Sequence, residues 1–156
     1  MTDTAAERNM ATTKKLLEDA MPNLDWDLMR SLVTPDAMLT RAGFADIYEA
    51  TGDAIPQKAN FIEWLQSGWK PLTDALSDMK GEAKDIVASG NTVMMKFRLE
   101  ATHSGTFAGA PATGKRVGWD EITVIHFNDE GKITEMWYMC QELSLAQQIG
   151  YKLQLA

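Results

Sequence analysis

The chain has 156 residues, of which 45% are hydrophobic and 24% are charged. This composition fits one globular domain over residues 1–156 and argues against a second domain or extensive disorder. The formal net charge of -7 argues against nucleic acid and against an anionic membrane surface as the main partner, because both require clustered Lys and Arg.

The number of cysteines and the sequence of the amino terminus limit the cellular compartment and the kinds of chemistry that we expect. Cys140 is the single cysteine, so neither an intrachain disulfide nor a cysteine-based metal site can form. The first residues lack the basic start and apolar core of a signal peptide, and no apolar run reaches the roughly 20 residues of a membrane span. We therefore expect a cytoplasmic protein without a metal or other cofactor.

The first third of the chain predicts two helices and a short strand. Apolar residues recur at helical spacing over residues 4–21, and a second short helix over 26–33 is followed by a turn at 34–36, because the residue before a proline leaves the helical region. The pattern over residues 38–41 predicts a short strand. The pattern over residues 43–52 predicts a loop, and we expect this loop to be a flap near the mouth of a pocket.

Residues 61–76 carry the strongest helical pattern in the chain. Their apolar stripe predicts a helix packed on a sheet, and Pro71 predicts a kink or break near Gly68. Trp64 and Trp69 lie on this stripe, and we expect both to help form the wall of a ligand pocket as well.

Two strands are predicted next, over residues 79–87 and 92–107, with a turn between them. In the second strand, alternate residues from Val93 to Ala101 are apolar and belong to the core. The opposite face is mixed and includes Arg98 and Glu100. We expect this face to meet a second subunit.

A hairpin follows, with strands over residues 117–127 and 132–140 joined by a turn at 128–131. In the first strand, alternation puts Trp119, Glu121, Thr123, Ile125 and Phe127 on one face, and the apolar members make this the expected core side. In the second strand, Met136, Tyr138 and Cys140 share one face, and neither face of that strand is polar enough to be wholly solvated. A closing helix over 142–149 presents Leu143, Ala146 and Ile149.

Four stretches of the last third resemble the SnoaL-like polyketide cyclases of the nuclear transport factor 2-like superfamily. They read ATHSG at 101–105, PATGKRV at 111–117, DEGKITE at 129–135 and LSLAQQIG at 143–150. The resemblance implies an α+β fold in which a strongly curved antiparallel sheet, shaped as a cone, wraps around three to four helices. It also implies an internal apolar pocket and a homodimer.

The chain departs from this family where the cyclases carry their acid and base. A His and, two residues later, an Asp act on the polyketide in those enzymes, and the matching positions here are Met136 and Tyr138. A thioether moves no protons, and a phenol is a poor base at neutral pH. The resemblance therefore implies the fold and a pocket for a small hydrophobic molecule more directly than cyclase activity.

Another acid–base pair is available, because alternation carries Glu121 inward and the resemblance implies that Tyr138, at the position of the family's Asp, faces the cavity. A carboxylate carried inward at Glu121 would have a raised pKa and could serve as a base, with Tyr138 as hydrogen-bond donor to a substrate carbonyl. Ketosteroid isomerase, in the same superfamily, combines a carboxylate and a tyrosine in this way. The expected substrate-binding residues are Trp119, Thr123, Met136, Trp64, Trp69, Tyr48, Arg41 and His103, although His103 also fits a purely local hydrogen bond to a loop.

Three functions follow as hypotheses. The first is a cofactor-independent isomerase, cyclase or lyase that acts by acid–base chemistry on a hydrophobic, polyketide-like carbonyl compound. The second is a binding protein that holds an apolar metabolite without converting it, because the family's His and Asp are replaced. The third is an assembly protein that uses the sheet face bearing Arg98 and Glu100.

Overall fold

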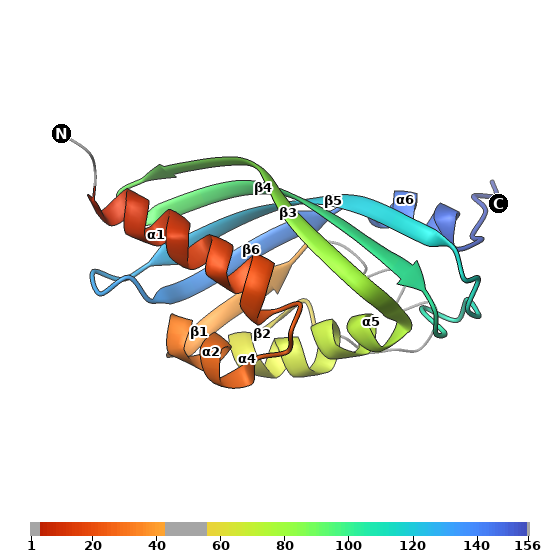
Figure 1. Cartoon of the computed structure of the whole chain (residues 1–156), viewed down its shortest axis with the longest axis horizontal. Helices are drawn as coiled ribbons and strands as arrows, with labels where there is room; N and C mark the ends of the chain where they lie inside the picture. Colours follow the sequence, from red (N-terminus) through yellow and green to blue (C-terminus); the bar gives the residue numbers. More distant parts are fainter. Residues whose placement is uncertain (1–3, 43–55, 156) are drawn as a thin grey trace.

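The computed structural model describes residues 4–42 and 56–155. In this part of the chain, a curved six-stranded sheet with the order β2-β1-β6-β5-β4-β3 is packed against helical segments (Figure 1). The predicted α+β fold is confirmed, with one difference. Because β1 pairs with β6 in parallel, the sheet is mixed and not wholly antiparallel.

The strands carry the alternation that the sequence predicts. They are β1 (Val33–Arg41), β2 (Lys58–Asn60), β3 (Leu76–Ser89), β4 (Thr92–His103), β5 (Arg116–Phe127) and β6 (Ile133–Cys140). In β4 the residues from Val93 to Ala101 alternate between buried and exposed or half-buried positions, as predicted. The turn between β5 and β6 is also confirmed, since Gly131 has a φ of +80° and Asn128 accepts a hydrogen bond from the Lys132 N–H at 2.9 Å.

The curvature of the sheet has a local cause in β3. The pairing of β3 with β4 shifts register between Ser77 and Lys80 and again between Ala83 and Asp85. The first shift contains Asp78, which has a φ of +51°. Bulges of this kind bend a strand and increase its twist. The sheet thereby curves around the helices that cover one of its faces.

Two helical segments provide most of that cover. The first runs through α1 (Thr4–Lys14) and the π-helical η1 (Lys15–Ala20), and crosses the sheet over β3 and β4 (Figure 1). The second runs through α4 (Phe61–Trp64), η2 (Leu65–Trp69) and α5 (Lys70–Ala75). Helical hydrogen bonding changes to the π pattern in η2, next to Pro71. The predicted break near Gly68 is absent, because helical structure continues without interruption from Phe61 to Ala75, and the irregularity there is this π-helical stretch.

Two short helices complete the described elements. In α2 (Trp26–Leu32), the Asp25 side chain accepts a hydrogen bond from the Leu28 N–H at 2.9 Å and caps the helix. In α6 (Glu142–Gln148), Gln148 forms hydrogen bonds with the part of β5 that extends beyond its pairing with β6. Its side-chain amide exchanges two hydrogen bonds with the backbone of Gly118, at 2.8 and 2.9 Å.

Three local predictions were wrong. Residues 34–36 form no turn but lie within β1, where the register with β6 shifts between Val33 and Met38. A strand tolerates Pro35 at such an irregularity because no ladder hydrogen bond is needed from it. Leu76, expected on the helix, begins β3. Leu143, expected to be packed, is 49% exposed, and Leu145 is buried in its place.

No described helix is long and apolar enough to cross a membrane. Residues 43–52, predicted as a loop, lie outside the described residues.

Candidate functional site

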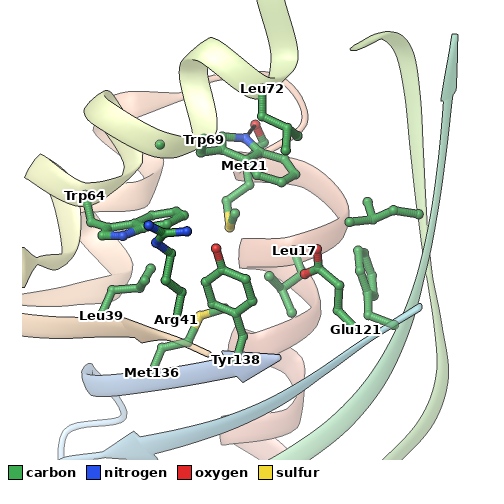
Figure 2. A pocket seen from close by; sticks show the side chains of 13 residues that line it. Leu17, Met21, Leu39, Arg41, Trp64, Trp69, Leu72, Glu121, Met136 and Tyr138 are labelled. Carbon is green, nitrogen blue, oxygen red and sulfur yellow. Dashed lines mark hydrogen bonds between the residues drawn. The ribbon is translucent and has the colours of Figure 1, made fainter. Parts of the chain in front are cut away.

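A pocket lies between the curved sheet and the two long helical segments (Figure 2). The sheet contributes side chains from four neighbouring strands, and the helices contribute an apolar roof. The lining residues are Leu17, Met21, Leu39, Arg41, Trp64, Gly68, Trp69, Leu72, Phe97, Leu99, Glu121, Met136 and Tyr138. The wall is therefore largely apolar, with a small group of polar side chains, as is usual for small-molecule sites.

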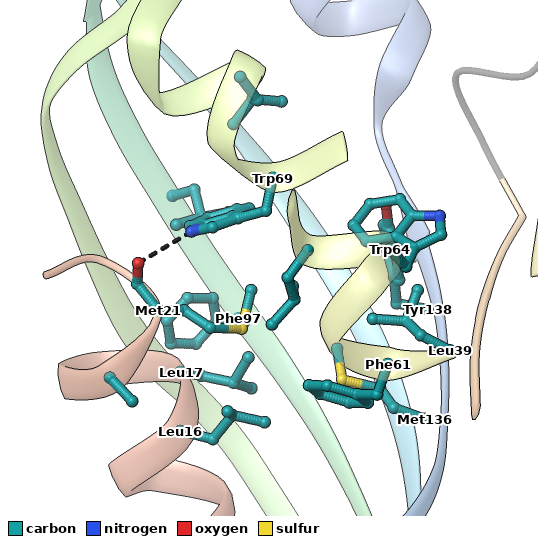
Figure 3. Close-up of a cluster of buried hydrophobic side chains, with 14 of the residues drawn as sticks. Leu16, Leu17, Met21, Leu39, Phe61, Trp64, Trp69, Phe97, Met136 and Tyr138 are labelled. Carbon is teal, nitrogen blue, oxygen red and sulfur yellow. Dashed lines mark hydrogen bonds between the residues drawn. The ribbon is translucent and has the colours of Figure 1, made fainter. Parts of the chain in front are cut away.

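Two indole hydrogen bonds fix the roof of the pocket. Trp69 Nε1 donates to the Met21 carbonyl at 2.9 Å, which ties the second helical segment to the end of the first (Figure 3). Trp64 Nε1 donates to the Pro56 carbonyl at 2.8 Å. The Trp64 ring meets the ring of Tyr138 edge-on, with centroids 5.5 Å apart. The aromatic wall is thus anchored on both sides of the pocket.

The pocket is narrow in this structure. The empty space among its side chains is about 600 Å³, part of it open solvent, but the centre of a water-sized sphere can occupy only about 30 Å³. That is room for roughly two water molecules. A larger ligand requires roof side chains to move, and Met21 is suited to this because a methionine side chain adapts readily to a new shape.

Glu121 is the acidic side chain of the pocket. It is partly buried on β5, opposite Phe97 of β4, and accepts a hydrogen bond from Trp119 Nε1 at 2.8 Å. Burial raises the pKa of its carboxyl group from 4.5 to about 7, while the hydrogen bond from Trp119 acts in the opposite direction. A carboxyl group with this pKa exchanges protons readily near neutral pH, as a general acid or base requires.

Tyr138 and Arg41 bring two more polar groups into the pocket. The two residues are paired in the parallel register of β1 and β6. Arg41 is only 3% exposed, and its Nε donates to the Pro56 carbonyl at 3.2 Å. The Tyr138 hydroxyl, the Arg41 guanidinium and the Glu121 carboxyl group all point toward the central space (Figure 2). A guanidinium keeps its positive charge at any physiological pH.

The structure brings six of the expected site residues together and places the others elsewhere. Glu121, Tyr138, Met136, Trp64, Trp69 and Arg41 line the pocket. Trp119 and Thr123 are buried on β5 but do not line it. His103 is buried at the end of β4, where its Nδ1 lies 3.0 Å from Thr113 Oγ1. Tyr48 lies outside the described residues.

Several lining residues had not been expected at the site. Leu17 and Met21 come from the first helical segment, and Phe97 and Leu99 come from β4. Helical and strand periodicity place all four in the core, and that was their only signal in the sequence. Periodicity shows that a side chain is buried, but not that it faces a cavity.

The described residues contain neither a reactive thiol nor a cluster of metal-binding side chains. Burial raises the pKa of the Cys140 thiol far above its ordinary value, so the reactive thiolate is not formed near neutral pH. In residues 4–42 and 56–155, no three His, Cys, Asp or Glu side chains lie close enough together to hold a metal ion. The polar groups that remain are suited to proton transfer.

The model of the SnoaL-like polyketide cyclase family matches residues 11–149 of the chain. Among solved structures, IdmH from Streptomyces antibioticus, a proposed polyketide cyclase, shares 26% identity and a TM-score of 0.76 over 92% of this chain and 99% of its own. A proposed SnoaL-like polyketide cyclase from Jannaschia sp. CCS1 shares 19% identity and a TM-score of 0.80 over 98% and 99%. No curated protein sequence matches the chain.

Proposed function

The chain belongs to the SnoaL-like polyketide cyclase family, and from this premise we propose that it is a cofactor-independent enzyme acting on a hydrophobic, polyketide-like carbonyl compound. The reaction is an isomerisation, cyclisation or elimination that begins with removal of a proton beside the carbonyl. One observation carries the proposal: Glu121, with a pKa of about 7, lines the same apolar pocket as Tyr138. A base and a hydrogen-bond donor then face one substrate.

The first step is proton abstraction. The ionised Glu121 carboxylate takes a proton from the carbon next to the substrate carbonyl, and the electron pair of the broken C–H bond moves to the carbonyl oxygen. The enolate oxygen accepts a hydrogen bond from the Tyr138 hydroxyl, and the Arg41 guanidinium stabilises its negative charge. Donors and charges held in place in a dry pocket act most strongly on the charge that develops during the reaction.

The second step returns the proton. In an isomerisation, the protonated Glu121 delivers it to a different carbon of the enolate. In a cyclisation, the enolate carbon forms a bond to a second carbonyl carbon of the same molecule, and the new alkoxide takes the proton from Glu121. In an elimination, the leaving group departs from the next carbon with its bonding electron pair and takes the proton from Glu121. All three routes restore the carboxylate and consume no other reactant, so the pocket needs no cofactor for them.

This assignment differs from the family's own acid and base. Cyclases of the family carry a His and an Asp where this chain has Met136 and Tyr138, and both of these line the pocket. In this chain the base is Glu121 on the neighbouring strand β5, and Tyr138, at the position of the family's Asp, is a hydrogen-bond donor. The substrate can therefore occupy the same space while the proton leaves toward β5 and not toward β6.

Deuterium exchange tests the proposal without knowledge of the natural substrate. The protein is incubated in D₂O at neutral to basic pD with two bicyclic ketones, 1-tetralone and 2-tetralone, and deuterium at the carbon beside the carbonyl is measured by mass spectrometry. We expect exchange well above that in buffer with an equal concentration of acetate. The rate should rise with pH through about 7, the pKa of Glu121, and then level off.

The alternative function is a non-catalytic binding protein for an apolar metabolite. Trp64 and Trp69 in the pocket wall make their fluorescence a measure of occupancy. If the ketones quench this fluorescence in a saturable way but acquire no deuterium, the enzyme proposal is wrong and the binding protein takes its place.

We also propose that two copies of the chain pair through the outer face of the sheet. This face carries exposed Met94 and Ile122, at 50% and 54%, together with Met139 at 49%. Ile122 and Met139 are opposite each other in the register of β5 and β6. Beside them, Arg98 lies 3.3 Å from Asp120 in an ion pair. An apolar strip bordered by charges is typical of protein interfaces.

Sedimentation velocity tests the pairing. The wild type is expected to sediment as a dimer and the Ile122→Lys variant as a monomer, because a lysine in the strip must be desolvated on pairing. Leu153→Lys, at a position 73% exposed near the carboxyl end, serves as the control and should remain dimeric. A monomeric wild type at tens of micromolar would contradict the proposal.

A further inference from the structure

We propose that Trp119 is a positioning residue that confines proton transfer at Glu121 to one carboxyl oxygen, Oε2. The inference rests on the proposed role of Glu121 as the base and adds to it a residue that touches no substrate. Its basis is one hydrogen bond, whose donor, Trp119, lies outside the pocket wall and whose acceptor, Glu121, lies within it.

The geometry is fixed by the strand. Trp119 and Glu121 are two residues apart on β5, so their side chains leave the same face of the sheet. The Trp119 indole is fully buried, and its Nε1 donates to Glu121 Oε1 at 2.8 Å. A buried indole has little freedom to turn away. The bond therefore sets the rotation of the carboxyl group and makes Oε2 the oxygen that does not face the indole.

The chemistry of the donor decides which oxygen carries the proton. An indole N–H can donate but has no lone pair with which to accept. In a neutral carboxyl group the carbonyl oxygen is a better acceptor than the hydroxyl oxygen, so the bond from the indole favours Oε1 as the carbonyl oxygen and Oε2 as the oxygen that carries the proton. Of the described residues, none donates a hydrogen bond to Oε2, so this oxygen can receive the substrate's proton without first breaking a bond within the protein.

The surrounding charges can also influence Glu121. The titratable and charged groups on the elements packed around it are Arg41 on β1, Tyr138 and Cys140 on β6, Glu142 on α6, and Lys96, Arg98 and Asp120 on the outer face of the sheet. All of them are retained when only the indole N–H is removed. A change of that one donor therefore isolates its effect, and because the bond lowers the pKa of Glu121, its loss should raise that pKa further.

The hydrogen bond can be observed directly by NMR, independently of any activity. The protein has five tryptophans, and the indole N–H resonance of Trp119 should shift with pH with a midpoint of about 7, the pKa of Glu121. The shift should disappear in Glu121→Gln. The indole of Trp69, which donates to the Met21 carbonyl, should show no such dependence on Glu121. A Trp119 resonance that does not titrate would overturn the inference, whatever the outcome of the exchange assay.

Kinetics then test the positioning role. In Trp119→Phe, the midpoint of the exchange rate against pH should move upward by about one pH unit, and the plateau at high pH should fall about tenfold because Oε2 is no longer held in place. Replacing the indole N–H by sulfur, through site-specific incorporation of 3-benzothienylalanine, should give the same shift in midpoint while preserving the shape of the side chain. Trp137→Phe, on the opposite face of β6, should change neither quantity.

The possible results separate the two proposals. If Trp119→Phe lowers thermal stability but leaves both the midpoint and the plateau unchanged, Trp119 is only a packing residue and the inference is wrong. If no ketone exchanges but the Trp119 resonance titrates with Glu121, the catalytic proposal has failed while the hydrogen bond stands. In that case the positioning role in catalysis is also rejected.

Discussion

Replacing Glu121 by glutamine is expected to lower the rate of deuterium exchange by about 10²- to 10⁴-fold, the range over which a positioned general base contributes to catalysis. Glutamine keeps the size of the side chain and can still accept the hydrogen bond from Trp119 through its amide oxygen. It cannot take up a proton. The same two ketones serve as probes, so the comparison needs no knowledge of the natural substrate.

The same variant should be more stable than the wild type at high pH. The pKa of Glu121 is raised from 4.5 to about 7 in the folded protein. Below pH 4.5 the side chain is protonated in both the folded and the unfolded state, and the neutral carboxyl group then makes its full contribution to the stability of the folded protein. As pH rises from 4.5 to 7 the unfolded state ionises first, and stability is lost until both states are ionised. The loss is about 3 kcal/mol at most, and about 1–2 kcal/mol is expected because the side chain retains some exposure.

Thermal unfolding at several pH values measures this effect. Glu121→Gln should match the wild type near pH 4.5 and unfold several degrees higher at pH 8. Glu135→Gln, on the opposite face of β6, provides a matched control and should show no such gain. An equal stability of Glu121→Gln and wild type at pH 8 would mean that the carboxylate is well solvated in the folded protein, and the argument for a raised pKa would fail.

A residue that lowers stability when it is ionised fits the trade-off between stability and activity that is expected of a functional site, and Glu121 is proposed here as such a residue. The sequence contained enough to locate it. The alternation along β5 carries Glu121 inward among Trp119, Ile125 and Phe127, and the tight turn at Gly131 sets the register that brings β6 alongside. The first inference uses the two-residue period of a strand and the second uses the turn at Gly131. Both are local patterns, which is why they could be made before the fold was known.

The rest of the pocket depended on contacts that no local pattern encodes. Arg41 reaches the site because β1 pairs in parallel with β6, a pairing between strands almost a hundred residues apart in the chain. Trp119 and Glu121 share a face of β5, and periodicity alone could not show that one lines the cavity while the other supports it. His103 was expected among the substrate-binding residues, but its imidazole lies at the end of β4 and is hydrogen-bonded to Thr113, outside the pocket wall.

Replacing Tyr138 by phenylalanine is expected to lower the exchange rate by about 10²- to 10³-fold, the cost of losing one donor to a developing oxyanion. The ring remains, so its edge-on contact with Trp64, at 5.5 Å between centroids, should be preserved along with the fold. Because the base is untouched, the pH midpoint should stay near the Glu121 pKa of about 7. The fall should appear in kcat more than in KM, since the hydrogen bond is strongest when the enolate forms.

This pattern separates a catalytic hydroxyl from a structural one. If the Tyr138 hydroxyl served only the core, Tyr138→Phe would change stability by about 1–3 kcal/mol and leave the exchange rate intact. Met136→Leu, one alternate position away on the same face of β6 and in the same wall, is the matched control. It preserves the volume of an apolar wall and should change the rate little. A loss of rate in Tyr138→Phe but not in Met136→Leu, with the pH midpoint still near 7, would support a catalytic role for the Tyr138 hydroxyl. Tyr138 would then act as a hydrogen-bond donor at the position where the family's cyclases carry their catalytic Asp.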